Sequence, residues 1–195
     1  MKRDIILAGV GGQGIISIAA VIGYAALDQG LHLKQSEVHG MSQRGGDVQS
    51  NLRISDKEIA SDLIPQGKAD LIISVEPLES LRYLPFLSKD GWLITSTRPL
   101  VNILDYPDMD KVLKEIEALP RYIALDAEQI GKDAGTAKAA NIVVLGAASP
   151  FLDMDYERLE NAVRFIFRRK GEKVIDINLN ALKAGRDFTE QYLVH

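Results

Sequence analysis

The sequence contains no cysteine and only three histidines. The lack of cysteine excludes a disulfide framework, a cysteine nucleophile and any iron–sulfur cluster held by cysteines of this chain. The histidines are His32, His39 and His195, and no two of them have the spacing of three or four residues that pairs metal ligands on one helix face. We therefore expect no metal site built mainly on histidine.

Long apolar runs and an excess of basic residues are also missing. No segment approaches the roughly 18 consecutive apolar residues of a membrane-spanning helix, and Met1-Lys2-Arg3 leads into a short apolar run without the long apolar region of an export signal. The formal net charge of -4 argues against electrostatic binding of nucleic acid, and the basic run 168–170 suits a helix end. We expect a cytoplasmic protein with neither a nucleic-acid nor a membrane partner.

The composition is that of an ordinary globular protein. The 195 residues are 46% hydrophobic and 26% charged, and no linker or repeat divides them. We expect a single domain over residues 1–195, with two small domains as the alternative. Strand-like and helix-like segments alternate along the whole chain, which predicts an α/β fold with three layers: a mixed, mostly parallel sheet between flanking helices.

Short apolar runs predict the buried strands, and longer amphipathic patterns predict the helices. The alternating segment 47–54 predicts a half-exposed strand, which Ser55-Asp56 would turn into a second short strand around Ile59 as an antiparallel hairpin. The segment 31–38 is polar for a buried strand. The predicted buried strands are 4–8, 71–75, 92–96 and 122–125. The predicted helices are 15–27, 78–87, 109–119, 138–147, 156–169 and 174–192.

A glycine-rich segment, Gly9-Val10-Gly11-Gly12-Gln13-Gly14, lies between the first strand and the first helix and fits the pattern G-x-G-x-x-G. Glycines permit positive φ angles and a close approach of the backbone to a ligand, while the N–H groups and the dipole at the helix start favour a phosphate or carboxylate. The alternative is a tight turn that packs helix against strand and binds nothing. The segment predicts an anion site in a strand–turn–helix unit.

The other marks of the common nucleotide-binding folds are weak here. A dinucleotide-binding domain has an apolar second strand that ends in an acid about 20 residues beyond the glycines. In this sequence Leu33-Lys34-Gln35-Ser36 stands there, and Glu37 ends a polar segment. No Gly-Lys-Ser/Thr follows the glycines, so a Walker A loop is absent. Binding of NAD is weakened as a hypothesis but stays open.

A second loop, at residues 37–46, places Arg44 beside Gly45 and Gly46, with Ser42 and Gln43 next to it. A guanidinium in this setting suits an anion or a carboxylate of a neighbouring chain, and the alternative is a solvated or salt-bridged surface arginine. His39 beside it is more simply a hydrogen-bonding group than a proton shuttle. Glu76 and Glu79 follow a strand end, but acids at a helix start are equally explained by the helix dipole.

The two loops together resemble the gamma-type subunit of 2-oxoacid:ferredoxin oxidoreductases. The run 69–73 leading to Glu76 and the segment 141–147 extend the resemblance over nearly the whole chain. Within that family, Val10-Gly11-Gly12-Gln13-Gly14-Ile15 and His39-Gly40-Met41-Ser42-Gln43-Arg44-Gly45-Gly46 most resemble the beta subunit of indolepyruvate oxidoreductases.

The resemblance implies the oxidative decarboxylation of a 2-oxoacid, an aryl pyruvate such as indolepyruvate, to an acyl-CoA, with electrons passed to ferredoxin. It implies thiamine diphosphate and iron–sulfur clusters on a partner alpha subunit, coenzyme A as co-substrate, and no cofactor or catalytic residue on this chain alone. The lack of cysteine and of a Gly-Asp-Gly run followed by paired asparagines agrees with that division.

Carried onto this sequence, the resemblance also implies a binding site for a phosphate of coenzyme A. Asn141 would hydrogen-bond toward the glycine loop, or would simply cap its helix. The residues implied to cradle the phosphate are Gly9, Gly11, Gly12, Gln13 and Gly14, and those implied to complete the site or face the partner are Ser42, Arg44, Gly45 and Gly46.

Two other classes of function stay open at this stage. The first is a self-sufficient nucleotide-binding protein, such as an NAD-dependent dehydrogenase or a nucleotide sensor, which rests on the glycine pattern alone. The second is a structural scaffold whose glycine loops only pack against a partner.

Overall fold

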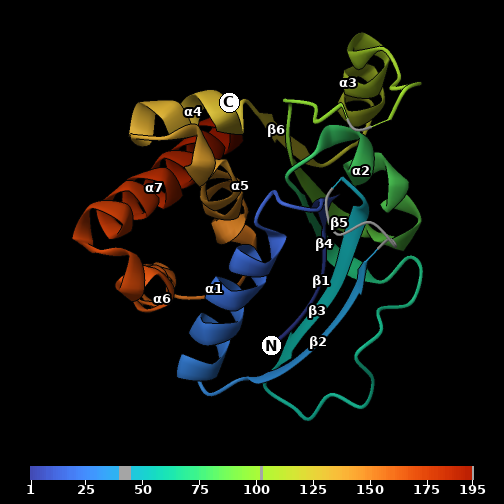
Figure 1. Cartoon of the computed structure of the whole chain (residues 1–195). Helices are drawn as coiled ribbons and strands as arrows, with labels where there is room; N and C mark the ends of the chain where they lie inside the picture. Colours follow the sequence, from blue (N-terminus) through green and yellow to red (C-terminus); the bar gives the residue numbers. More distant parts are fainter. Residues whose placement is uncertain (40–44, 102, 195) are drawn as a thin grey trace.

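A six-stranded sheet is the centre of the structure, a computed structural model that describes residues 1–39, 45–101 and 103–194, apart from the side chain of His39 (Figure 1). The strands are β1 (Lys2–Val10), β2 (His32–His39), β3 (Asp47–Ser55), β4 (Ala69–Ser74), β5 (Leu87–Ser96) and β6 (Tyr122–Leu125). Their order is β2-β3-β1-β4-β5-β6. The neighbours β1, β4, β5 and β6 are parallel, whereas β3 is antiparallel to both β1 and β2, so the predicted mixed, mostly parallel sheet is confirmed.

Helices cover both faces of this sheet, which gives the three layers (Figure 1). Side chains alternate along β1: Ile5 and Leu7 enter one hydrophobic core, and Ile6 and Ala8 enter the other. The first core packs under α1 (Ile15–Asp28), α4 (Ala127–Ala134), α5 (Ala140–Ala148), α6 (Tyr156–Phe167) and α7 (Glu172–Val194). The second packs under α2 (Pro77–Arg82) and α3 (Met109–Glu117). Short 3-10 turns occupy Leu84–Phe86, Ala137–Ala139, Ser149–Phe151 and Arg168–Lys170.

The helices α5 and α7 pack with their backbones almost in contact. A Cβ atom added to Gly146 would lie 2.0 Å from the carbonyl oxygen of Leu182, and one added to Gly185 would lie 2.0 Å from that of Val143. Only glycine at both positions permits this distance. The close crossing holds α5, and with it Asn141 near its first turn, against the body of the protein.

The predicted hairpin after residue 54 is wrong. The segment 56–68 contains no strand, and β3 instead pairs with β1 on one side and β2 on the other. The polar strand β2 lies at the edge of the sheet, where polar side chains are tolerated and discourage pairing with other chains. The predicted helix 78–87 is shorter than expected: α2 ends at Arg82, before Pro85.

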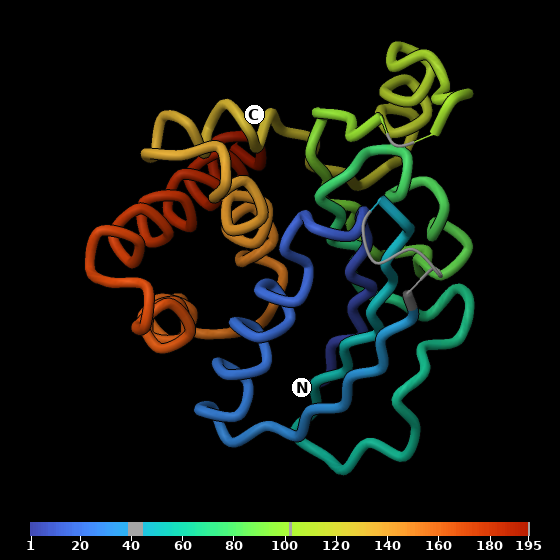
Figure 2. The backbone as a smooth tube through the Cα atoms, viewed as in Figure 1, coloured from blue at the N-terminus to red at the C-terminus, as the bar shows by residue number. Residues whose placement is uncertain are grey.

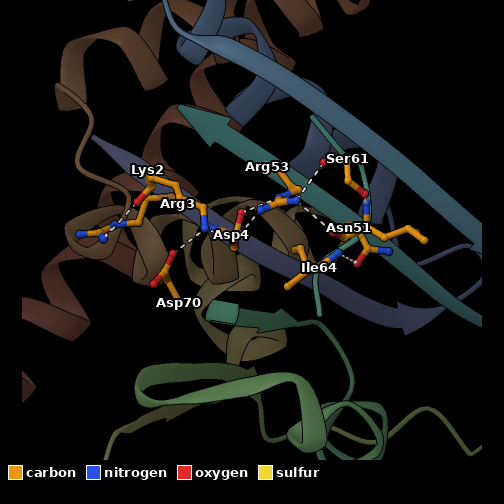
Figure 3. Close-up of polar contacts among 9 residues, drawn as sticks. Lys2, Arg3, Asp4, Asn51, Arg53, Ser61, Ile64 and Asp70 are labelled. Carbon is orange, nitrogen blue, oxygen red and sulfur yellow. Dashed lines mark hydrogen bonds and ion pairs between the residues drawn. The ribbon is translucent and has the colours of Figure 1, made fainter. Parts of the chain in front are cut away.

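Instead of forming a strand, the segment 56–68 is fastened to the sheet by a buried ion pair (Figure 3). The Asp4 carboxylate is fully buried and accepts hydrogen bonds from Arg53, at 2.8 and 3.1 Å. The same guanidinium donates to the carbonyl oxygens of Ser61 and Leu63, at 2.9 and 3.0 Å. The side-chain oxygen of Asn51 accepts a further bond, from the N–H of Ile64 at 3.3 Å. A charge that is paired and hydrogen-bonded in this way tolerates burial.

Candidate functional site

The order of the strands creates a crevice at the carboxyl ends of β1 and β4. These neighbours are parallel, but β1 leads into α1 on one face of the sheet and β4 leads into α2 on the other. Ligands of open α/β sheets bind at such a topological switch point. The glycine turn after β1 and the segment Val75-Glu76 after β4 meet at this point, because Val75 N–H donates to the Ala8 carbonyl at 3.1 Å.

The glycine turn is held in shape by the side chain of Gln13. Its Oε1 accepts from the N–H of Val10 at 2.8 Å, and its Nε2 donates to the carbonyl of Val75 at 3.4 Å. Because both ends of the amide are used, Gln13 positions the turn and connects it to the end of β4. Gln13 therefore has a structural role in the turn.

Two glycines of the turn adopt conformations that other residues rarely take. Gly12 has φ +102° and Gly14 has φ +82°, and Gly14 directly precedes α1. Within the described part of the chain, the N–H groups of Gly12, Gly14 and Ile15 have no hydrogen-bond acceptor. Free N–H groups at a helix start, together with the helix dipole, attract an anion.

Asn141 reaches the glycine turn, as predicted. Its Nδ2 donates to the carbonyl of Gly14 at 3.0 Å, across 127 residues of sequence. Its alternative role as a helix cap does not fit, because Ala139 occupies the N-cap position of α5. A Cβ at Gly14 would lie 2.5 Å from the same Nδ2, so the contact also requires glycine.

The second predicted loop lies beside the first, as far as it is described. The N–H of Gly11 donates to the carbonyl of Gly46 at 2.8 Å, and Gly45 adopts φ +80°. Ser42 and Arg44 lie outside the described residues, as does the side chain of His39, whose backbone ends β2. The structure therefore joins Gly46 to the glycine turn.

Cavities open on either side of the turn. One has a volume of about 510 Å³ and the other about 390 Å³, and both are lined by Gly12, Gln13, Lys138 and Asn141. The larger is further lined by Val75, Ser96, Arg98, Pro99, Leu100, Glu128, Ala137 and Ala140. The smaller is further lined by Gly14, Ser17, Thr136, Ala139, Phe167, Lys170, Val174, Ile177 and Asn178.

Cationic side chains line both cavities. Within the described residues, Lys138 and Lys170 have no carboxylate partner, and Lys170 lies 5.4 Å from the centre of the Phe167 ring. Arg98 instead pairs with Asp126: its Nε donates to Oδ2 at 2.8 Å. That hydrogen bond, with the N–H of Gln129 and the nearby charges, lowers the pKa of Asp126 although burial opposes the shift. The crevice thus offers free cations beside the free N–H groups.

Glu76 anchors the loop between β5 and α3, which lies beside the larger cavity. Its buried carboxylate accepts from the N–H of Glu79 at 2.8 Å, from the N–H of Leu100 at 3.3 Å and from the hydroxyl of Tyr106. Burial and then this carboxylate raise the pKa of Tyr106 above its usual range. Glu79 pairs with Arg82 at 2.7 Å. Both acids therefore make structural contacts, which agrees with the interpretation that they stabilise the start of a helix.

Arg98 and Lys138 are the site residues that sequence reasoning missed. Arg98 stands two residues after the end of β5, where α/β proteins place ligands, and Lys138 stands just before α5. Those positions are the signals that point to them. Lys138 could have been predicted together with Asn141, because both stand at the start of the same apolar helical segment.

The described residues do not include a group of three or more His, Asp or Glu side chains able to hold a metal ion. Among those same residues, no helix is long and apolar enough to cross a membrane.

Comparisons with known proteins agree on one family. The family model described as pyruvate ferredoxin/flavodoxin oxidoreductase matches residues 4–188. The indolepyruvate oxidoreductase subunit IorB of Archaeoglobus fulgidus is 38% identical, over 95% of this chain and 94% of that protein. IorB of Thermococcus kodakarensis is 36% identical, over 98% of each. The ketoisovalerate oxidoreductase subunit VorA of Methanothermobacter marburgensis is 29% identical over 96% of this chain but only 36% of its own length.

Solved structures share the fold. The gamma subunit of a keto/oxoacid ferredoxin oxidoreductase from Geobacter sulfurreducens is 26% identical, with a TM-score of 0.69, over 97% of this chain and 99% of that one. A 2-oxoglutarate:ferredoxin oxidoreductase from Magnetococcus marinus, described with 2-oxoglutarate, coenzyme A and succinyl-CoA bound, has a TM-score of 0.76 at 21% identity. It matches 97% of this chain, which corresponds to 31% of that longer chain.

Proposed function

The chain belongs to the pyruvate ferredoxin/flavodoxin oxidoreductase family, and from that premise we propose that it is a non-autonomous subunit of a 2-oxoacid:ferredoxin oxidoreductase that converts indolepyruvate or a related aryl pyruvate to an acyl-CoA. The observation that carries the choice of substrate class is the 35–38% identity to IorB subunits over nearly their whole length. Residues 1–195 would act as one domain of that complex in the cytoplasm.

The part that this chain would supply is a site for a phosphate of coenzyme A. Free N–H groups at Gly12, Gly14 and Ile15 and the unpaired cation of Lys138 support it. The coenzyme A described for the Magnetococcus marinus enzyme, whose chain includes the same fold, supports it further. The residues of the proposed site are Gly9, Gly11, Gly12, Gln13, Gly14, Ser42, Arg44, Gly45, Gly46 and Asn141.

The redox groups of such an enzyme do not fit this chain. Iron–sulfur clusters need cysteine thiolates, and the sequence has none. Thiamine diphosphate and the clusters would therefore reside on a partner alpha subunit, which would pass electrons to ferredoxin. The proposed contribution of this chain is to bind and orient coenzyme A, with no catalytic residue of its own.

The self-sufficient nucleotide-binding alternative is not favoured. In a dinucleotide-binding sheet the second strand lies beside the first and parallel to it, so that its terminal acid reaches the ribose. Here β3 lies between β1 and β2, and both β1 and β2 are antiparallel to it. Glu37, near the end of β2, therefore lies two strands from the glycine turn.

Co-expression with the candidate alpha subunit tests the proposal. The purified complex is expected to reduce a dye acceptor with indolepyruvate only when coenzyme A is present, and neither subunit alone is expected to do so. Oxidation of indolepyruvate by this chain unaided, or tight retention of NAD(H) by it, would contradict the proposal. The readout is the rate of dye reduction with and without coenzyme A.

A further inference from the structure

The loop that connects β5 to α3 exposes a run of large apolar side chains. The exposed fractions are 39% for Leu100, 69% for Val101, 47% for Ile103 and 105% for Leu104. We call these four residues the apolar loop. Soluble proteins rarely leave such side chains clustered and uncovered unless another molecule covers them.

This loop is held in place from inside the protein. Buried Glu76 accepts hydrogen bonds from the N–H of Leu100 and from the Tyr106 hydroxyl, one at each end of the loop. Arg98, just before it, is fixed by Asp126 at 2.8 Å. These hydrogen bonds anchor the loop at Leu100 and Tyr106, and the loop lies at the margin of the molecule near α3 (Figure 2). An anchored backbone loses little entropy when it binds.

The position of the loop indicates what covers it. Leu100 belongs to the apolar loop and also lines the larger cavity beside the glycine turn, together with Pro99. In VorA and in the Magnetococcus marinus enzyme, the part that matches this chain is only 36% and 31% of a longer polypeptide. The IorB relatives match over nearly their whole length, so in them a contact with the remainder of the enzyme is a contact between subunits.

We propose that the apolar loop docks on an apolar surface of the catalytic partner subunit, the polypeptide that corresponds to the remainder of those longer chains, and so covers the mouth of the coenzyme A cavity. This inference rests on the proposed function. It adds to that function the surface that would join this chain to its partner.

The test measures the affinity of the full-length chain for the purified partner subunit by calorimetry. The variant Val101→Asp/Leu104→Asp would bury unpaired carboxylates on docking, and we expect binding to weaken at least about 30-fold, which corresponds to a loss of roughly 2 kcal/mol. Leu63→Asp is the matched control, because Leu63 is 56% exposed on the 56–68 segment. It should bind as the wild type does, and all three proteins should share one thermal midpoint.

Each other outcome overturns the inference. Wild-type affinity in Val101→Asp/Leu104→Asp would overturn the docking surface while leaving the proposed function standing. No binding of the wild-type chain to the partner would overturn both. A dimer of the isolated chain that the double substitution dissociates, with partner binding unaffected, would assign the loop to a second copy of the chain instead.

Discussion

Among the described residues, the hydrogen bond from Asn141 to Gly14 is the one side-chain bond that fixes the start of α1 to α5. The Asn141 side chain is 8% exposed, so the bond is shielded from competing water. Gly14 carries one of the N–H groups proposed to bind phosphate, and its carbonyl accepts the hydrogen bond from Asn141 on α5. The orientation of the anion site therefore depends on a residue that needs no contact with the anion.

Replacing Asn141 by alanine is expected to lower the free energy of unfolding by about 1 kcal/mol, the usual net value of one hydrogen bond. The affinity of the complex for coenzyme A should fall with it, because the turn loses its support. Asn141→Asp should reduce that affinity further, since a carboxylate would then line both cavities. Urea unfolding and calorimetric titration of coenzyme A measure the two effects.

Asn180→Ala is the control for this prediction, because Asn180 is an exposed asparagine on α7 that lines neither of those cavities. It should leave both quantities unchanged. Equal coenzyme A affinities for wild type, Asn141→Ala and Asn141→Asp would remove Asn141 from the proposed site.

The individual residues of the site were only partly predictable from sequence. The glycines and Asn141 stand in local patterns, because a positive φ before a helix and an amide before an apolar helix segment leave signs in the sequence. Arg98 and Lys138 became site residues only when two loops 40 residues apart were found to line one cavity. Gln13 was predicted to belong to the site, but its use as a brace between β1 and β4 depends on a strand pairing that spacing does not reveal.

At the scale of whole elements, the site depends on how α4 and the β5–α3 loop are joined. Asp126 is the N-cap of α4: its Oδ1 accepts from the N–H of Gln129 at 3.0 Å, and its Oδ2 accepts from Arg98. One carboxylate thus starts a helix and holds the arginine that lines the larger cavity. Since Arg98 lowers the pKa of Asp126, this junction is sensitive to acid.

Acid is expected to release this junction. The folded-state pKa of Asp126 lies below its unfolded value, so its contribution to stability is complete above the ordinary value, about 4, and is lost as the pH falls through the lower folded value. Asp126→Asn keeps a capping oxygen but cannot form the ion pair, so it should lose less stability than the wild type between about pH 4 and pH 2. Thermal midpoints measured for both proteins across that range provide the comparison.

At neutral pH the wild type should be at least as stable as Asp126→Asn, and the difference should shrink on acidification. A constant difference at all pH values would mean that the ion pair with Arg98 contributes nothing to stability. Asp133→Asn is the control: Asp133 is on the same helix, and among the described residues its carboxylate accepts from Gln129 Nε2, at 2.9 Å, and has no ion pair.

Most elements were predictable, and the exceptions have physical causes. Short apolar runs in the sequence predict the parallel strands, because such strands are buried on both faces. The hairpin around Ile59 was predicted wrongly because alternation identifies β3 as a strand but does not identify its partner, which is set by contacts far along the chain. The helix α4 was missed because it has only eight residues and few apolar ones. The two glycines at the α5–α7 crossing carry no local signal either.

At the scale of the whole molecule, the glycine turn, the cations and the apolar loop all lie at the carboxyl ends of the parallel strands. The turn follows β1, and the loop follows β5. Apolar side chains of α5 and α7 pack in the core on one face of the sheet. On the proposed function, this one end of the molecule would both bind coenzyme A and contact the partner subunit. Recognition of the 2-oxoacid would then lie on the partner.

This division predicts that a change in the cavities of this chain alters the use of coenzyme A and not the choice of 2-oxoacid. Lys138 lines both cavities without a carboxylate partner in the described structure, so it is the cation best placed to meet a phosphate. In the assembled enzyme, Lys138→Ala should raise the KM for coenzyme A about tenfold, since a charge-assisted hydrogen bond contributes roughly 1.5 kcal/mol. The ratio of kcat/KM for indolepyruvate to that for phenylpyruvate should stay at its wild-type value.

Lys183→Ala is the matched control, because Lys183 is an exposed lysine on α7 that pairs with Asp187 at 2.5 Å, and neither of these residues lines either cavity. It should change neither quantity. If Lys138→Ala shifted the substrate ratio while leaving the KM for coenzyme A unchanged, the crevice would belong to the 2-oxoacid, and the free cation beside the glycine turn would meet its carboxylate. If both quantities moved together, the two substrates would meet on this chain. Only a change confined to coenzyme A agrees with a subunit that holds the acceptor and leaves the oxoacid to its partner.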